Sequence, residues 1–326
     1  MQILMGKLAH NTGSLLECML FAKEAAMNLF LYLSTVLIWG STWLAIYFQL
    51  GEAPVVVSVA YRFILAALLF WLLLKLTGRL QPLSKRDQGF VVLQGICLFS
   101  LNFICFYNAT LYIPSGLVSV IFSLATLYNA LGNRLFYREK LDARVLVAGL
   151  VGLVGLLVLF LPELRQTQSE HVVKGVALAA LGTLFFSLGN MISKRNSLQG
   201  LSPLTTNAYG MGYGSLLLCL ILLLTGQAPV LPSSPTYWGA LVYLSVFGSI
   251  FAFTAYLMLV ARIGATRAAY ATVLFPLVAL SLSALFEGYQ WSLWSLLGML
   301  LVIAGNLIIN DQLRLPTLRS LVRQAN

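Results

Sequence analysis

Charged residues are scarce in this chain: they form 9% of its 326 residues, against about 25% in soluble globular domains. Hydrophobic residues form 60%, so a water-soluble fold of this size would have too few polar side chains to cover its surface. Glycine, proline and cysteine number only 26, 10 and 4, which excludes collagen-like, disordered and disulfide-stapled chains. The composition therefore indicates an integral membrane protein built as one polytopic domain.

Metal-binding and catalytic patterns are also missing. The four cysteines form no CxxC pair and no spaced set with the two histidines, and three of them lie in apolar runs, where a free cysteine behaves as a small hydrophobe. The sequence has no Walker A string, no HExxH and no GxSxG. We therefore expect no metal, no cofactor, no use of ATP and no enzymatic activity.

What the sequence has in abundance is long apolar runs. A helix that crosses a bilayer needs about 20 such residues, and β-barrel strands would alternate polar and apolar instead. Ten continuous candidate spans are found, at 28–50, 55–76, 89–110, 114–136, 143–161, 173–193, 204–225, 237–260, 266–286 and 292–310. The predicted fold class is an all-α integral membrane protein with ten transmembrane helices, whose short loops make neighbours pack as antiparallel hairpins.

The basic residues predict the orientation of these spans. On the ten-span count, 17 of the 20 Lys and Arg residues lie on one side of the membrane, which the positive-inside rule assigns to the cytoplasm. Both termini are then cytoplasmic, with residues 1–27 as an arm or interfacial helix and residues 311–326 as a tail. The net charge of +10 thus reflects topology in a lipid bilayer and not a nucleic-acid partner. No signal peptide is expected ahead of the first span.

The chain also matches itself at an offset of 149 or 150 residues. The coinciding pairs are Gly40 and Gly189, Pro54 and Pro203, Ile113 and Ile263, and Gly149 and Gly298. Residues 28–161 and 172–310 are therefore predicted to be two five-helix repeats. Because five is an odd number, the second repeat enters the membrane upside down, which is typical of transporters. Chance similarity among leucine-rich helices is the alternative.

Several short motifs carry a family resemblance. They are Trp39-Gly40-Ser41-Thr42, Pro54 followed by Arg62-Phe63, Tyr112-Ile113-Pro114-Ser115-Gly116, Arg138-Glu139-Lys140-Leu141, and the run 262–268 with Pro276 beyond it. In order and spacing the chain resembles EamA-type members of the drug/metabolite transporter superfamily. Thr126 departs from the family pattern, because many relatives carry a proline there that matches Pro276. The resemblance implies two bundled repeats around a central cavity, and export or exchange of small metabolites such as amino acids.

Arg62 is the main charge inside a predicted span. It lies eight residues past Pro54, roughly 12 Å from the outer end of the helix at 1.5 Å per residue. A charge at the middle of a membrane helix costs about 2.5–3.5 kcal/mol on insertion scales, so Arg62 should face the bundle or a wet cavity. It either binds an anionic group of the solute, or pairs with Glu52 or helix-end carbonyls.

Polar and aromatic residues inside the spans are further candidates for the substrate pathway. With Arg62 the candidate set is Trp39, Ser41, Thr42, Asn102, Tyr107, Asn108, Asn190, Tyr209, Tyr213, Tyr256 and Tyr270. Buried amides and phenols need partners, which a polar solute can provide. Hydrogen bonds between helices and interfacial anchoring are the alternative roles.

Gating and coupling have fewer candidates. Pro114 and Pro276 are candidate gating positions, because a proline can kink the fourth and ninth spans. No span has an acidic residue near its middle, which favours facilitated diffusion or exchange, and Glu287 is the candidate if proton coupling exists. Glycine stripes in the fifth and sixth spans indicate close helix packing, with a hinge or a homodimer contact as alternatives.

Together these features predict a secondary transporter in the cytoplasmic (inner) membrane. It would export or exchange small polar metabolites, amino acids or related compounds, by alternating access. The alternative is a membrane receptor or scaffold subunit that does not transport.

Overall fold

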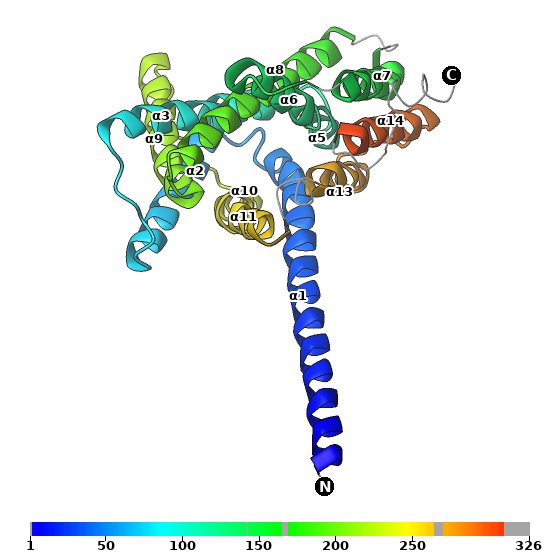
Figure 1. Cartoon of the computed structure of the whole chain (residues 1–326). Helices are drawn as coiled ribbons and strands as arrows, with labels where there is room; N and C mark the ends of the chain where they lie inside the picture. The colour runs from blue at the N-terminus through cyan, green and yellow to red at the C-terminus, as the bar shows by residue number, and fades with distance from the viewer. Residues whose placement is uncertain (1, 142, 165–168, 264–269, 310–326) are drawn as a thin grey trace.

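The computed structural model describes residues 2–141, 143–164, 169–263 and 270–309, and within these ranges the chain is helical with no strand (Figure 1). The helices of the first half are α1 (Gln2–Tyr47), α2 (Val55–Leu76), α3 (Lys85–Ile96), the π-helix η1 (Cys97–Leu101), α4 (Asn102–Ala109), α5 (Ser115–Phe122), α6 (Ala125–Tyr137) and α7 (Ala143–Leu164). Those of the second half are α8 (Ser169–Leu198), α9 (Pro203–Thr225), α10 (Pro235–Val242), the π-helix η2 (Tyr243–Phe251), α11 (Ala252–Ile263), α13 (Tyr270–Phe286) and α14 (Leu293–Ile309).

Helices lie on all ten segments that the sequence predicts to be apolar spans. In the described part of the chain, eight of them are long and apolar enough to cross a membrane, from Lys23–Tyr47 to Pro235–Tyr256. The last two apolar helices, Leu274–Phe286 and Leu293–Ile308, are shorter. The expectation of a multi-pass, all-helical membrane protein is thus confirmed.

The N-terminal arm and the first predicted span form one helix. α1 is 46 residues long, or about 69 Å at 1.5 Å per residue, and its first half projects away from the bundle (Figure 1). Only Lys23–Tyr47 has the composition of a membrane span.

Proline and serine set the starts of several helices. Pro54 directly precedes α2, and Pro203 and Pro235 are the first residues of α9 and α10. Proline suits these positions because its φ is already helical and its missing N–H has no helical partner there. Ser84 caps α3 by accepting a hydrogen bond from the Asp87 N–H at 3.1 Å.

The fourth segment is interrupted at a different place from the one predicted. Pro114 directly precedes α5 and so begins that helix instead of kinking it. The break lies at Ser123 and Leu124, between α5 and α6 and just before Thr126. Pro276, in contrast, lies inside the continuous helix α13.

The two halves of the chain contact each other through a repeating pattern of helix pairs. α7 packs against α14, α2 against α9, and α5 against α13. α1 of the first half contacts η2, α11 and α13, and its counterpart α8 contacts η1, α3, α4, α5 and α6. The first span of each half therefore packs against the third and fourth spans of the other half, so the contacts stay the same when the two halves are exchanged.

An aromatic cluster fills the space where helices of both halves cross. The Phe122 ring lies 4.6 Å from Phe186 and 5.7 Å from Phe275, centre to centre. Trp43 lies 5.3 Å from Phe106 and 6.5 Å from Phe275. Such ring pairs stabilise a core beyond their buried area, so α1, α4, α5, α8 and α13 share one apolar centre.

Glycine allows the closest approach of the two halves, and this generates a test. A Cβ atom on Gly155 would lie 2.8 Å from the backbone oxygen of Gly298 and from the backbone nitrogen of Val302, whereas a Cβ on Gly152 in the same helix meets nothing within 4 Å. We expect Gly155→Ala to lower the free energy of unfolding by about 1–3 kcal/mol, because backbone must shift. Gly152→Ala should leave it unchanged or raise it, because alanine is the better helix former. Thermal unfolding of both purified variants in detergent measures this, and equal shifts would contradict the packing.

Candidate functional site

Arg62 is buried where α2 of the first half meets η2 of the second. Only 3% of the surface of this residue is exposed. The Nε atom donates to the Ser249 hydroxyl at 3.4 Å, and the guanidinium carbon lies 4.4 Å from the centre of the Phe103 ring. A cation over an aromatic face is attracted by the ring's negative charge density. The arginine is therefore held by neutral groups.

Tyr107 and Gln49 continue this polar cluster. The Tyr107 hydroxyl interacts electrostatically with the Arg62 guanidinium and donates a hydrogen bond to Gln49 Oε1 at 2.7 Å. Gln49 lies in the turn that follows α1, and both Gln49 and Tyr107 are at most 1% exposed. Because the tyrosine donates to Oε1, the amide nitrogen Nε2 of Gln49 is directed away from the Tyr107 hydroxyl.

Two buried donors of the cluster have no hydrogen-bond partner among the described residues. They are Arg62 Nη1 and Gln49 Nε2. The ion pairs in the described part of the chain are Lys194 with Glu139 and Arg195 with Asp87, so Arg62 has no carboxylate within reach there. Glu52 is exposed at the helix end, and pairing of Arg62 with Glu52 is not observed. Buried donors without partners are costly, and the buried charge makes this cluster the candidate site.

The π-helix η2 shapes the side of the site that faces Arg62. Ser245 Oγ contacts the Arg62 backbone oxygen at 3.0 Å, and Ser249 Oγ donates to the Leu244 oxygen, five residues earlier, at 2.9 Å. Between them, a Cβ on Gly248 would meet Thr42 at 2.8 Å and Arg62 Nη2 at 3.7 Å. π-helical turns occur often at functional sites. Here the wider turn brings two hydroxyls and a glycine against the arginine.

Three further candidates on α1 contact η2 or α11. Thr42 borders Gly248 as described, and Ser41 Oγ shares a 2.6 Å hydrogen bond with the Tyr243 hydroxyl of η2. The Trp39 ring lies 5.2 Å from the Tyr256 ring of α11, centre to centre. The structure therefore brings Trp39, Ser41, Thr42, Arg62, Tyr107 and Tyr256 to the α1–α2–η2–α11 region.

The remaining pathway candidates with described side chains have their contacts elsewhere. Asn102 and Asn108 bond to the backbone of their own helix, with Asn102 Oδ1 accepting from Phe103 N and Asn108 Nδ2 donating to Ile104 O. Asn190 Nδ2 approaches Asn129 Oδ1 at 3.4 Å. Tyr209 and Tyr213 stack on each other along α9 with ring centres 6.5 Å apart. The Tyr270 side chain lies outside the described residues.

Glu287 lies at the end of α13 and holds the start of α5. Its carboxylate accepts a 2.8 Å hydrogen bond from the Ser115 backbone N–H and a second, very short one from the Ser115 hydroxyl. A carboxylate at a helix N-terminus is favoured by the free N–H groups and the helix dipole. Glu287 thus joins the two halves at one end of the bundle, and its role in coupling stays a prediction.

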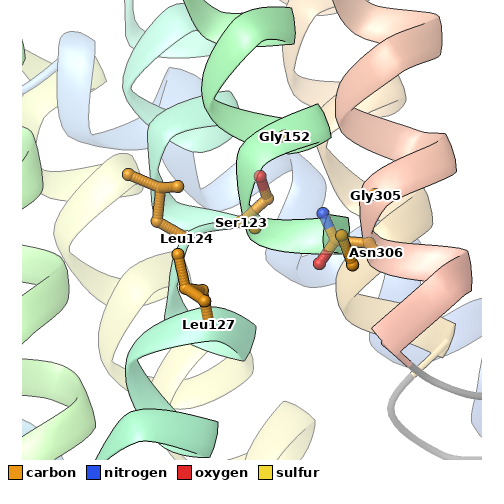
Figure 2. Close-up of a pocket in the computed structure, with 8 residues that line it drawn as sticks. Ser123, Leu124, Leu127, Gly152, Gly305 and Asn306 are labelled. Atoms are coloured by element: carbon orange, nitrogen blue, oxygen red, sulfur yellow. The ribbon is translucent and has the colours of Figure 1, made fainter. Parts of the chain in front are cut away.

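A small pocket lies between the α5–α6 segment, α7 and α14 (Figure 2). It is lined by the α5–α6 break and by glycines of α7 and α14, and Asn306 faces Ser123 across it. Its volume of about 10 Å³ is close to the minimum for one water molecule. In this conformation the Arg62 cluster is closed, and this pocket is separate from it.

The sequence prediction missed Gln49, Ser245 and Ser249. Gln49 lies at the end of an apolar run, where an amide side chain is expected to be at the membrane surface and in contact with water. The serines are four residues apart, on one face of a helix in an apolar span. That spacing was the available signal, but it does not identify the partner helix.

The comparisons with known proteins agree with this architecture. The sequence model of the EamA-like transporter family matches residues 26–161 and again residues 173–311. The chain belongs to the EamA-like transporter family. The resemblance drawn from the short motifs is thereby confirmed, and the family and its relatives are transporters and not enzymes.

Individual relatives cover most of the chain. Protein PagO of Salmonella typhimurium is 29% identical over 84% of this chain and 90% of its own length. The uncharacterized inner membrane transporter YedA of Escherichia coli is 26% identical over 81% and 85%. The uncharacterized transporter YyaM of Bacillus subtilis is 24% identical over 79% and 85%. A crystal structure 17% identical in sequence superposes with a TM-score of 0.62, over 89% of this chain and 99% of that one, which shows a shared fold.

Arg62 has no ion-pair partner among the described residues, and this yields the first prediction on the site. We expect Arg62→Met to leave the free energy of unfolding unchanged or to raise it by up to about 2 kcal/mol, because an apolar side chain of similar size removes a buried charge. Arg195→Met is the matched control and should lower it, because Asp87 loses its partner at 2.6 Å. Thermal unfolding in detergent compares them. A large loss of folded Arg62→Met protein would show that the arginine serves the fold.

The Glu287 contact yields a second prediction. Glu287→Ala should lower the free energy of unfolding by about 1 kcal/mol, because α5 loses its capping carboxylate. Ser115→Ala should cost part of the same energy, and the double variant should cost less than the two single changes together, because both remove one interaction. A double-mutant cycle of thermal unfolding measures this coupling. Additive losses would show that the two side chains act independently.

Proposed function

We propose that this protein is a secondary transporter that exports or exchanges small polar metabolites, amino acids or related compounds, across the inner membrane. It works by alternating access between two inverted five-helix repeats. The observation that carries the proposal is the buried polar cluster around Arg62, which is built jointly by α2 of one half and η2 of the other. Ionisable groups inside a membrane bundle are typical of substrate pathways.

Three observations support ten spans in two repeats. The helix contacts between the halves map onto themselves when the halves are exchanged. Each half has a π-helix in its third span, η1 at Cys97–Leu101 and η2 at Tyr243–Phe251. The family's sequence model also matches the chain twice. With five spans in each half, the second repeat is inverted relative to the first.

Polar contacts between the halves at both ends of the bundle support two gates. At one end Arg195 of α8 pairs with Asp87 at 2.6 Å, and Gln94 of α3 bonds both Asn196 and Asn207 at 2.9 Å. The positive-inside rule supports a cytoplasmic location for this end and for both termini. At the outer end Glu287 holds Ser115. In alternating access the two sets of contacts would open in turn.

The position of the acidic residues favours facilitated diffusion or exchange. Glu287 is engaged at a helix end, and the central Arg62 cluster has no carboxylate among the described residues. A proton-driven carrier commonly has an acidic residue or histidine deep in the bundle. A homodimer stays a prediction of the glycine stripes.

Transport by the purified protein in proteoliposomes tests the proposal. Vesicles loaded with a mixture of unlabelled L-amino acids should accumulate external radiolabelled amino acids by counterflow, because a carrier exchanges solute across the membrane. We expect the rate to stay the same when an ionophore abolishes the pH gradient. Protein-free vesicles are the control. Folded protein that exchanges no amino acid or related metabolite would favour a receptor or scaffold subunit instead.

A further inference from the structure

The Arg62 cluster has more hydrogen-bond donors than its own residues can use. Arg62 Nη1 and Gln49 Nε2 are both buried without partners, on residues 3% and 1% exposed. The Tyr107 hydroxyl donates to Gln49 Oε1 at 2.7 Å and so orients the Gln49 amide, and it also interacts electrostatically with Arg62. The two free donors therefore belong to one buried cluster.

We propose that Arg62, Gln49 and Tyr107 recognise the carboxylate group of the transported solute. The inference rests on the proposed transport function and defines its substrate class: monocarboxylates and amino acids with a free carboxylate. Arg62 would supply the positive charge and one N–H donor, Gln49 would supply a second donor, and Tyr107 would hold the Gln49 amide in place.

The charge of the cluster favours a carboxylate over a phosphate group. Arg62 is its only cation among the described residues, and the groups around it are neutral: Gln49, Ser245, Ser249, Tyr107 and the Phe103 ring. One guanidinium balances a single negative charge, and its planar N–H groups match the two oxygens of a carboxylate. A phosphate with nearly two negative charges would remain undercompensated at a buried site.

The lack of a carboxylate partner argues against a purely structural arginine. A buried charge is stable when it is paired and hydrogen-bonded, and an apolar side chain would otherwise serve the packing better. The Arg195–Asp87 pair shows how this chain fixes an arginine that joins helices. Arg62 differs because a donor is left over, and a solute carboxylate provides the missing acceptor.

The position of the cluster links binding to opening of the bundle. Arg62 belongs to α2 and its Ser249 partner to η2, and these elements come from different halves. The donors are covered in this closed conformation. Separation of the halves along α2 and η2 would break the Arg62–Ser249 contact, which at 3.4 Å is a long hydrogen bond. The free donors would then be accessible to the solute.

Competition between matched carboxylates and carboxamides tests the inference. Counterflow of a labelled L-amino acid is measured against unlabelled L-amino acids, acetate and benzoate, against the corresponding carboxamides, and against inorganic phosphate. We expect the wild-type protein to prefer each carboxylate over its amide by about tenfold or more, since a hydrogen bond to a charged group is worth that much. Arg62→Met should abolish the preference, and Gln49→Leu and Tyr107→Phe should reduce it by about tenfold or to equality.

Tyr137→Phe is the matched control. The Tyr137 hydroxyl also joins two helices, but it donates to the Met191 oxygen at 2.6 Å, near Lys194 and outside the Arg62 cluster, so the preference should stay unchanged in this variant. If Arg62→Met does not fold, Gln49→Leu and Tyr107→Phe still decide the question. A full preference in both, or equal competition by amides or phosphate in the wild-type protein, overturns the inference while leaving the carrier function intact.

A second readout separates failure of the inference from failure of the transport proposal. Thermal unfolding in detergent is measured with acetate and benzoate and with acetamide and benzamide, because ligand binding to the folded state raises the unfolding temperature. Stabilisation by carboxylates alone that disappears in Gln49→Leu supports the site even if no counterflow is found. Equal stabilisation by acids and amides, or none by either, counts against it.

Discussion

In a bilayer, every polar group of a spanning helix must find its partner inside the protein. The chain meets this constraint at the contacts between helices. Gln94 bonds Asn196 and Asn207, and Ser187 bonds Asn129 at 2.8 Å, all between elements distant in the sequence. Other polar residues of the spans, such as Thr35 and Thr183, donate to a carbonyl oxygen of their own helix. Arg62 Nη1 and Gln49 Nε2 depart from this constraint, because they have no hydrogen-bond acceptor among the described residues. They mark a place where a bound solute can supply the missing acceptor.

The same structure divides the contacts between its halves into two kinds. α7 and α14 meet through glycines, with Gly155 and Gly298 so close that neither has room for a methyl group. Such packing tolerates little sliding, because backbone lies directly on backbone. α2 and η2 meet instead through serine hydroxyls and a long hydrogen bond to Arg62. The first kind of contact can act as a fixed pivot, and the second can separate at small cost.

Features that depend on residues close together in the sequence could be predicted from it, and features that depend on contacts between distant helices could not. The run from Val55 to Leu76 was predicted to the residue, because apolar composition and the preceding Pro54 are local signals. The break at Ser123 and the π-helix η2 were not predicted, because they depend on the packing of distant helices against the segment. Arg62 was identified as a candidate by its cost in lipid. Gln49 was missed because its hydrogen-bond partner is Tyr107, 58 residues away. The stacking of Tyr209 on Tyr213 was missed because composition does not distinguish a residue that lines a cavity from one that packs on its own helix.

A binding site of one half that is covered by the other half also explains how a solute can drive movement. A ligand shifts a conformational equilibrium only by the difference between its affinities for the two states. If both partners of Arg62 came from α2, a bound carboxylate would leave the relative position of the halves unchanged. Because Ser249 comes from η2 of the other half, the free donors stay covered while the halves are in contact, and a carboxylate binds them better once the halves separate. Binding then favours the open arrangement, and the glycine-packed α7–α14 pair keeps the halves together while they open.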